Sequence, residues 1–405
     1  FPNNLMKEII EKFLNPKSIA VIGASNTEDK VGNILIKKIC QCNRIVIPIN
    51  PKSTPILNRE TYPTVLHYPK SIDLAIIAIP AKYVPKALEQ CGKKQIKNII
   101  IISAGFKEVG NNKLQNKLEK IKEKYKLNIL GPNCFGIVNP KINLDTTFAN
   151  TTPKKGSTAF LSQSGALWSY AADLNIGFSG FVSLGNMSDL SFTDFLEYYI
   201  NDKSTKKIIL YIEKLKQGKR FIELCQSTKK EIIVIKAETE EGNKAAISHT
   251  ASLANDYKVY NGAFKQAGVK QVDTLTKALG LKEQNLDKKL KGKHLYLLTN
   301  AGGAGTILTD KLSKMGYTIH GPEDILGTAT AHDYKIALNK IKAEYYNILV
   351  ILTPQSMAEP TKTAQEIVRS KHKNKVIAIF AGDKSIQEAK RILELNKVPF
   401  FNLVI

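Results

Sequence analysis

Ser18-Ile19-Ala20-Val21-Ile22-Gly23-Ala24-Ser25 is the stretch that decides the fold of the first part of this 405-residue chain. An apolar run of strand length leads directly into a turn of glycine and small residues. Similar runs follow at 44–49, 73–79 and 98–103, and helical stretches separate them. Apolar runs that alternate with helices predict a parallel sheet covered on both faces. We therefore expect a nucleotide-type α/β domain whose ligand lies at the carboxyl ends of the strands.

The turns after these runs narrow the choice of ligand. Residues 23–32 lack the G-x-G-x-x-G spacing of a dinucleotide site, and the second run ends in Asn50-Pro51-Lys52, where such a site needs an acidic residue. NAD is therefore disfavoured. Lys52 would suit a phosphorylated ribose, and Gly23 with Ser25 leaves room and a hydroxyl for a pyrophosphate at a helix start. An ordinary surface lysine remains the alternative for Lys52.

Two later segments repeat the design of a strand, a small-residue turn and a helix. Residues 158–161 enter Ser162-Gln163-Ser164-Gly165, and residues 295–298 enter Thr299-Asn300-Ala301-Gly302-Gly303. Small residues leave backbone N–H groups open at a helix N-terminus, which carries roughly half a positive charge. Each turn is therefore a candidate anion site, with tight strand-to-helix packing as the alternative. A polar stretch at 283–293 predicts the hinge between the second and third units.

His249 is the candidate nucleophile. Residues 242–252 are small and follow a strand expected at 231–237, which predicts a mobile loop that presents one imidazole. Glu213 ends another strand, 208–213, at its carboxyl end. A carboxylate there can accept the N–H of one ring nitrogen and leave the other nucleophilic. The alternatives are a surface histidine and a glutamate that caps a loop or pairs with Lys214 or Lys216.

Composition bounds the partners and the compartment. The net charge is +23, but 54 of the 59 basic residues are lysines distributed over all the helices, which argues against nucleic acid as a ligand. Five cysteines without a CxxC pair predict a reducing compartment, with no disulfide and no metal site. No apolar run approaches the ~20 residues of a membrane span, and no signal peptide is recognisable. We expect a cytoplasmic protein without a membrane partner, whose natural start is absent because the first residue is Phe.

Together these motifs resemble the α subunit of ADP-forming (NDP-forming) acetyl-CoA and other acyl-CoA synthetases, in the succinyl-CoA synthetase superfamily. The resemblance covers nearly the whole chain. It implies a Rossmann-like CoA-binding domain at 1–141, a flavodoxin-like ligase-CoA domain with the phosphohistidine at 142–286, and a second flavodoxin-like domain at 287–405. The motifs that carry it are Gly131-Pro132-Asn133-Cys134, Ser162-Gln163-Ser164-Gly165, Tyr211-Ile212-Glu213, Ser248-His249-Thr250 and Thr299-Asn300-Ala301-Gly302-Gly303.

The resemblance implies an acid-thiol ligase, an ADP-forming acetate–CoA ligase. It would convert acyl-CoA, ADP and phosphate to acid, CoA and ATP through an acyl phosphate and a phosphohistidine at His249, which Glu213 holds. The residues implied for coenzyme A are Gly23, Ala24, Ser25, Lys52, Ile79, Pro80, Ser103, Gly105 and Glu108, with Asn133 near the thioester. Those implied for phosphate are Ser162, Ser164, Gly165, Gly302 and Gly303.

The nucleotide site is expected outside this chain, because no ATP-grasp-like domain follows. The resemblance implies a β subunit that binds ADP or ATP with Mg²⁺, in an α2β2 heterotetramer. Two other functions stay open: the α subunit of a succinate or other dicarboxylate CoA ligase, and a non-catalytic CoA-binding scaffold. The acyl preference and the choice between ADP and GDP also stay open. Residues 317–324 and the end of the chain are shorter than the family pattern, which suggests missing residues.

Overall fold

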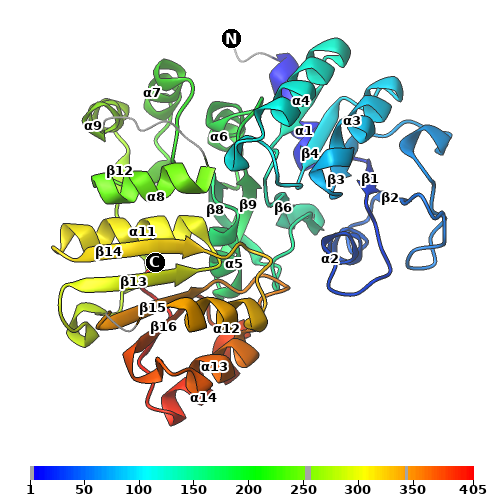
Figure 1. Ribbon diagram of the computed structural model, residues 1–405. Coiled ribbons are helices and arrows are strands. Elements are labelled where there is room, and N and C mark those ends of the chain that lie inside the picture. Colours follow the sequence, from blue (N-terminus) through cyan, green and yellow to red (C-terminus); the bar gives the residue numbers. More distant parts are fainter. Residues whose placement is uncertain (1–3, 251–256, 343–344) are drawn as a thin grey trace.

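The computed structural model describes residues 4–250, 257–342 and 345–405, without the side chains of residues 4 and 247–250 (Figure 1). These residues form three units, each built on a mostly parallel sheet. The first unit contains α1 (Asn4–Leu14), β1 (Ser18–Ile22), α2 (Val31–Ile39), β2 (Ile45–Ile49), β3 (Leu74–Ile77), α3 (Val84–Lys93), β4 (Asn98–Ile101), α4 (Asn112–Tyr125) and β5 (Asn128–Leu130), with short 3-10 turns η1 (Val65–His67), η2 (Ala81–Tyr83) and η3 (Lys107–Val109).

The second and third units follow the same alternation. The second contains β6 (Ile137–Asn139), η4 (Pro140–Ile142), β7 (Leu144–Asp145), β8 (Lys154–Ser162), α5 (Ala166–Asp173), β9 (Gly177–Ser183), α6 (Phe192–Asn201), β10 (Lys207–Tyr211), α7 (Gly218–Gln226), β11 (Glu231–Ile235), α8 (Glu240–Thr250), α9 (Tyr257–Ala267), β12 (Lys270–Val272) and α10 (Leu275–Ala278). The third contains η5 (Asp287–Lys289), β13 (His294–Thr299), α11 (Gly302–Lys314), β14 (Thr318–Asp324), α12 (Ala331–Lys340), β15 (Asn347–Leu352), α13 (Pro360–Arg369), η6 (Lys373–Lys375), β16 (Val376–Phe380), η7 (Lys384–Ile386), α14 (Gln387–Leu395) and β17 (Phe400–Phe401).

All three sheets share one strand order. The first sheet runs β2-β1-β3-β4-β5, the third runs β14-β13-β15-β16-β17, and the second runs β9-β8-β10-β11-β12 with β6 and β7 added antiparallel at the β9 edge. In each sheet the first and third strands of the unit are neighbours, and the chain turns in opposite directions on either side of them. Ligands of doubly wound sheets bind at this switch point, beyond the carboxyl ends of the strands.

The predicted strands are confirmed where the sequence was apolar on both faces. Every residue of β1 and of β3 is buried, as a sheet with helices on both sides requires. The stretch predicted as the hinge, 283–293, contains no helix or strand except η5. No helix among the described residues is both long enough and apolar enough to cross a bilayer.

The prediction of a loop at 242–252 was wrong for the residues that the structure describes. Residues 240–250 form α8, while residues 251 and 252 lie outside the description. Ala245 and Ala246 are strong helix formers and are buried. Glu240 and Glu241 add negative charge in the first turn, where the helix dipole favours it. The small side chains of this segment therefore allow a helix to pack closely against its neighbours, instead of forming a loop.

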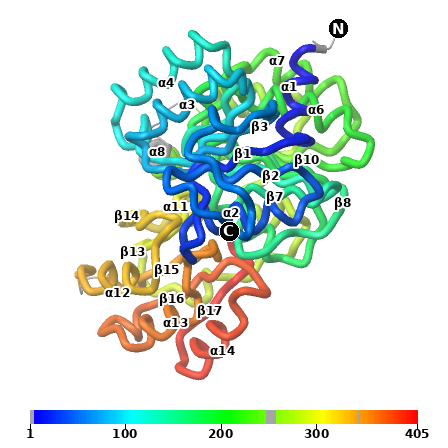
Figure 2. Tube along the Cα trace, turned by 90° about the vertical axis from the view of Figure 1, so that its right-hand side faces the viewer, coloured from blue at the N-terminus to red at the C-terminus, as the bar shows by residue number. Residues whose placement is uncertain are grey.

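The second and third units share one apolar core. Leu167 and Trp168 of α5 belong to the same buried cluster as Ala304 and Leu308 of α11. In Figure 1, α8 lies alongside α11, and the two helices are in contact. Figure 2 shows the first unit stacked against the second, with the third unit below. The helices α5 and α11, which follow the first parallel strands of the second and third units, therefore pack against each other.

Candidate active site

The residues predicted to bind coenzyme A lie together at the carboxyl edge of the first sheet. Gly23 follows β1 with φ of +99°, and a Cβ atom there would lie 2.8 Å from Ile79 Cγ2. Only glycine fits this turn without strain. Ser103, after β4, donates from Oγ to the Ile79 carbonyl at 2.6 Å and accepts from the Ile79 N–H at 3.2 Å. The turns after β1, β3 and β4 thus form one continuous rim, with Pro80 next to Ile79.

Lys52 lies on an exposed turn after β2, beside the same rim. Asn50 holds this turn: its Oδ1 accepts from the Lys52 N–H at 2.9 Å, and its Nδ2 donates to the Ala24 carbonyl at 2.8 Å. Ser25 Oγ accepts from the Thr27 N–H at 3.0 Å, which shapes the turn after β1. The amide of Asn50 therefore couples the Lys52 turn to the turn that contains Gly23, Ala24 and Ser25.

A polar network joins this rim to the second unit. Glu108 Oε1 accepts from the Gly105 N–H at 2.6 Å, and its Oε2 accepts from Asn186 Nδ2 at 2.6 Å. The Asn186 Oδ1 in turn accepts from Asn133 Nδ2 at 3.3 Å. Glu108 and Asn133, predicted separately, thus share one partner. Asn186 was not predicted from the sequence, because it lies in the turn after β9 and carries no motif of its own.

The two turns predicted to bind phosphate lie against each other. Ser164 stands just before α5 and Gly303 in the first turn of α11, and a Cβ atom on Gly303 would overlap the Ser164 side chain. Each turn contains an equivalent internal hydrogen bond. Ser162 Oγ donates to the Ser164 carbonyl at 2.6 Å, and Thr299 Oγ1 donates to the Ala301 carbonyl at 3.1 Å. Two helix N-termini therefore open on one place, where their partial positive charges add.

The side chain of Ser164 fits an anion at this junction. It is 1% exposed, and its Oγ has no hydrogen-bond partner among the described residues. Buried hydroxyls are ordinarily satisfied, so an open one beside two helix N-termini is consistent with a ligand that accepts its proton. Gly165 and Gly302 border the same point, at the starts of α5 and α11.

Glu213 lies two residues beyond β10, also at the carboxyl edge of the second sheet. Gln163 positions it, because Gln163 Oε1 accepts from the N–H groups of Glu213 and Lys214 at 2.6 and 2.7 Å. The motif turn Ser162-Gln163-Ser164-Gly165 therefore forms the candidate anion site and also holds the backbone of Glu213. Glu213 is 6% exposed, so it sits inside the molecule rather than on a loop surface.

A buried lysine was missed by the sequence analysis. Lys236 follows β11, is 7% exposed, and donates from Nζ to the Glu213 carbonyl at 2.9 Å. Its ammonium also lies 4.3 Å from the centre of the Tyr260 ring. Burial lowers the pKa of Lys236 to about 8, although the nearby carboxylates of Glu213 and Asp310 oppose the shift. One lysine among 54 carried no signal in the sequence.

His249 belongs to the last turn of α8, and its side chain lies outside the described part of the structure. The helix itself is well placed for the predicted role. It contacts η3 of the first unit, which contains Glu108, and both α11 and β14 of the third unit. The element that carries His249 therefore connects the two regions predicted to bind coenzyme A and phosphate.

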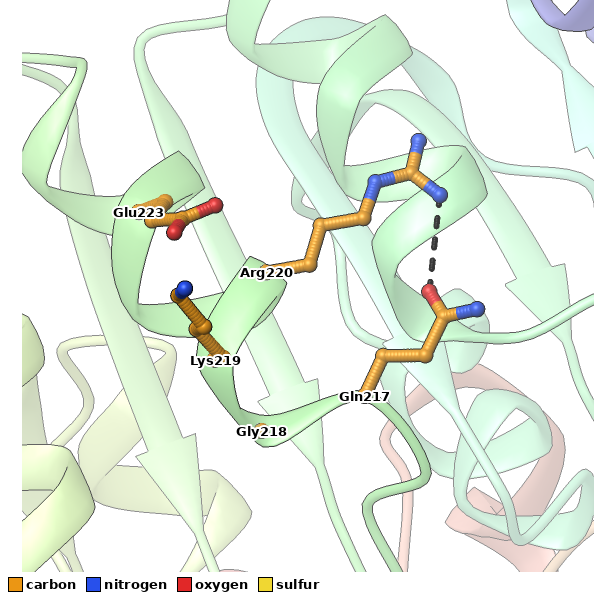
Figure 3. A pocket seen from close by; sticks show the side chains of 5 residues that line it. All are labelled: Gln217, Gly218, Lys219, Arg220 and Glu223. Atoms are coloured by element: carbon orange, nitrogen blue, oxygen red, sulfur yellow. Dashed lines mark hydrogen bonds between the residues drawn. The ribbon is translucent and has the colours of Figure 1, made fainter.

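One other surface feature lies away from these residues. A surface hollow at the start of α7 is lined by Gln217, Gly218, Lys219, Arg220 and Glu223 (Figure 3). Arg220 is already paired there, with Asp194 at 3.2 Å and Glu197 at 2.6 Å, and none of the predicted site residues lines the hollow. Among the described residues, no group of three His, Cys, Asp or Glu side chains could hold a metal ion.

Comparison with known families agrees with this architecture. Residues 17–140 match the family described as "CoA binding domain", and residues 155–283 match the "Succinyl-CoA ligase like flavodoxin domain". The first match covers the rim around Gly23 and Lys52. The second contains the Ser164 turn, Glu213 and α8. The predicted fold class, a CoA-binding domain followed by flavodoxin-like units, is confirmed.

Individual relatives extend the match over the whole chain. The chain is 38% identical to "Acetate--CoA ligase [ADP-forming] I" of Archaeoglobus fulgidus over 97% of its own length, but it spans only 61% of that relative. It is 36% identical to "Acetate--CoA ligase [ADP-forming] II subunit alpha" of Pyrococcus furiosus, covering 97% of this chain and 94% of the subunit. A solved structure of acetyl-coenzyme A synthetase 1 from Candidatus Korarchaeum cryptofilum, in complex with phosphate and ADP, matches with a TM-score of 0.64 at 31% identity, over 97% of this chain and 93% of that one. The chain therefore belongs to the family of ADP-forming acetate–CoA ligases and their α subunits.

Proposed function

We propose that this chain is the α subunit, or the α part, of an ADP-forming acetate–CoA or acyl-CoA ligase. The reaction converts acyl-CoA, phosphate and ADP to acid, CoA and ATP. The observation that carries the proposal is the meeting of two helix N-termini at Ser164 and Gly303, together with the buried Glu213, whose backbone is held by the same turn. The names of the relatives support the acid-thiol ligase chemistry.

The chemistry follows in three balanced steps. A phosphate oxygen attacks the carbonyl carbon of the thioester. The CoA thiolate departs, and an acyl phosphate forms. One ring nitrogen of His249 then attacks the phosphorus, and the carboxylate of the acid leaves. Finally, an oxygen of the ADP β-phosphate attacks the phosphohistidine, so that ATP forms and the imidazole leaves. Glu213 accepts the N–H of the other ring nitrogen, which keeps the attacking nitrogen unprotonated.

The chain's own residues would supply binding and charge stabilisation. Phosphate and the transferred phosphoryl group bind at Ser162, Ser164, Gly165, Gly302 and Gly303, where helix N-termini offset negative charge. Coenzyme A binds along the rim formed by Gly23, Ala24, Ser25, Ile79, Pro80, Ser103 and Gly105. Lys52 faces its ribose phosphate, and Glu108 and Asn133 lie toward the thioester. The rim and the phosphate turns lie in different units, and α8 contacts η3 of the first unit and α11 of the third.

We further propose the domain boundaries 1–141, 142–286 and 287–405. The first boundary lies near the end of the CoA-binding match at residue 140, although β6 pairs with β9 of the second sheet. We also propose that ADP with Mg²⁺ binds to an ATP-grasp unit, supplied by a β subunit in an α2β2 heterotetramer. The relative named "subunit alpha", of which this chain spans 94%, supports a separate partner. Five free cysteines are consistent with a reducing cytoplasmic location.

Phosphorylation of His249 tests the proposal. The wild-type chain with its β partner should become labelled from acetyl-CoA and labelled phosphate, and the label should be acid-labile and base-stable. His249→Asn should lose the label and keep its affinity for CoA. Full labelling of the variant would refute the assignment, and a wild-type protein that binds CoA without any label would be a scaffold.

Turnover with a panel of acyl-CoAs separates the ligases from each other. Acetyl-CoA and other monocarboxylic acyl-CoAs should support ATP formation, because the relatives with nearly full coverage are named for acetate. Preferential turnover of succinyl-CoA would make the chain a dicarboxylate ligase instead. ATP formation by the isolated chain would refute the need for a second nucleotide-binding unit.

A further inference from the structure

The second and third units hold each other through two aspartates in equivalent positions. Asp173 stands in α5 and Asp310 in α11, each eight residues after the glycine at the start of its helix, Gly165 or Gly302. Both carboxylates are buried, at 4% and 2% exposure. Each of them reaches out of its own unit: Asp310 binds the segment that follows β11, and Asp173 binds the segment that follows β16.

Asp310 holds the start of α8. Its Oδ1 accepts from the N–H groups of Glu238 and Thr239 at 2.7 and 2.6 Å, and from Thr239 Oγ1 at 2.9 Å. Its Oδ2 pairs with Lys314 at 3.0 Å. The first turn of α8 closes on the same group, because Thr239 Oγ1 accepts from the Gly242 N–H at 3.0 Å. A carboxylate from the third unit therefore caps the helix that carries His249.

Asp173 makes the matching contacts at η7. Its Oδ2 accepts from the N–H groups of Asp383 and Ser385, both at 2.9 Å, and its Oδ1 accepts from Ser385 Oγ at 2.6 Å. The approach is equally close on both sides: a Cβ atom on Gly382 would lie 2.6 Å from Asp173, and one on Gly242 would lie 2.6 Å from Asp310. Both aspartates thus accept two backbone N–H groups and one hydroxyl from the other unit, although Asp310 receives all three on one oxygen and pairs its second oxygen with Lys314. The helix that follows η7 is α14, which carries no predicted catalytic residue.

We propose that Asp310 is a positioning residue for phosphoryl transfer, which sets the place of His249 by anchoring the opposite end of α8. This rests on the proposed function. An eleven-residue helix is marginal by itself, so its contacts with the rest of the protein determine its position. Since α8 contacts both η3 and α11, a shift at its first turn moves its last turn relative to both substrate regions. Misplacement of a reacting group by ~1 Å can cost on the order of a hundredfold in rate.

The pair of aspartates provides its own control. Asp310→Ala and Asp173→Ala each remove one buried carboxylate that accepts three bonds from the other unit, so both should lower the melting temperature to a similar extent. Single-turnover labelling of His249 from acetyl-CoA and labelled phosphate, in the complex with the β partner, should slow at least tenfold in Asp310→Ala and less than twofold in Asp173→Ala. The affinity for CoA should stay within twofold in both.

A conservative variant and amide exchange complete the test. Asp310→Asn keeps an oxygen that can accept the three bonds, so it should recover most of the labelling rate. Amide hydrogens of residues 240–246 should exchange faster in Asp310→Ala than in the wild type. In Asp173→Ala their exchange rates should equal those of the wild type. Equal rate losses in the two alanine variants, or a wild-type rate in Asp310→Ala, would overturn the proposal. If the wild type is never labelled, the proposed function fails, and exchange alone then decides whether Asp310 anchors α8.

Discussion

Ser164 and Gly303 touch at the point where α5 of the second unit and α11 of the third unit begin. Each residue lies in a turn that was recognisable in the sequence, but their contact depends on how two units with the same strand order face each other. The contact leaves no space for a side chain on Gly303. It also brings the open hydroxyl of Ser164 between two helix N-termini.

Gly303→Ala should therefore damage the phosphate site. Its methyl group would overlap Ser164, forcing α5 and α11 apart and displacing the N–H groups that we propose bind the phosphate. We expect the KM for phosphate to rise at least tenfold with little change in the KM for acyl-CoA, in steady-state assays of the reconstituted complex. The double variant Ser164→Gly/Gly303→Ala should regain the wild-type melting temperature but not the affinity for phosphate. An unchanged KM for phosphate in Gly303→Ala would exclude this site.

The strands, the turns and the order of the units were predictable because the signal is local. An apolar run that enters a turn of small residues determines both the strand and the helix start at Ser164 and at Gly302. At Gly23 the predicted helix start was wrong, because seven further residues precede α2, which begins at Val31. The form of α8 was not predictable in this way, because its small residues carry little hydrophobic periodicity. Its helix depends on contacts with α11 and on a cap from Asp310, more than sixty residues later in the chain. Long-range partners of this kind leave no pattern in one sequence.

Asn186 and Lys236 were missed for the same reason. Each acquires its role only when a strand end of one unit meets another segment: Asn186 between Glu108 and Asn133, and Lys236 beside Glu213. The buried lysine is the more informative of the two. Its equivalent in the third unit, the residue after β16, is Ala381, so this position in the fold does not require a cation.

The free energy of unfolding should depend on pH through Lys236. Burial lowers the pKa of Lys236 to about 8 from the ordinary 10.5, so between these values the unfolded chain binds a proton that the folded chain does not. Stability of the wild type relative to Lys236→Met should therefore rise from about pH 8 to 10.5, by at most ~1.4 kcal/mol per pH unit. Below pH 8 the difference should be constant. Denaturant titrations at several pH values would measure it.

Lys230→Met is a suitable control for that experiment. Lys230 also donates to backbone carbonyls, those of Tyr199 at 2.9 Å and Asp202 at 2.6 Å, but it precedes β11 at the other end of the strand from Lys236. Its pKa is also lowered by burial, but the side chain is only half-buried and the carboxylate of Asp202 opposes the shift. A smaller change of stability with pH is therefore expected for this variant. The same slope in both variants would mean that the Lys236 site is not specially enclosed.

Asn186→Ala should weaken the binding of coenzyme A, although we do not place Asn186 in contact with the ligand. The amide donates to Glu108, whose other oxygen holds the Gly105 N–H, so its loss loosens the loop after β4. A hydrogen bond to a charged group contributes about 1.5–3 kcal/mol, and we expect the Kd for CoA to rise by roughly tenfold. Gln115→Ala is the control, since Gln115 crosses the same boundary to Ser188 at 2.8 Å but does not contact Glu108. Isothermal titration would measure the affinity of both variants for coenzyme A. An equal loss of affinity in the two variants would contradict the role of Asn186.

Lys52→Ala tests whether the exposed turn after β2 recognises the ribose phosphate of coenzyme A. The loss should be about 1–3 kcal/mol in binding free energy, the scale of a charge-assisted hydrogen bond. Dephospho-CoA lacks the phosphate, so the wild type should bind it more weakly than CoA, whereas Lys52→Ala should bind both ligands alike. The control is Lys117→Ala, an exposed lysine on α4 near the opposite edge of the first sheet, which should discriminate like the wild type. Because exposed charges are screened by salt, the difference should also shrink as ionic strength rises. If Lys52→Ala still prefers CoA over dephospho-CoA by the wild-type factor, the phosphate is bound elsewhere and Lys52 is one more surface lysine.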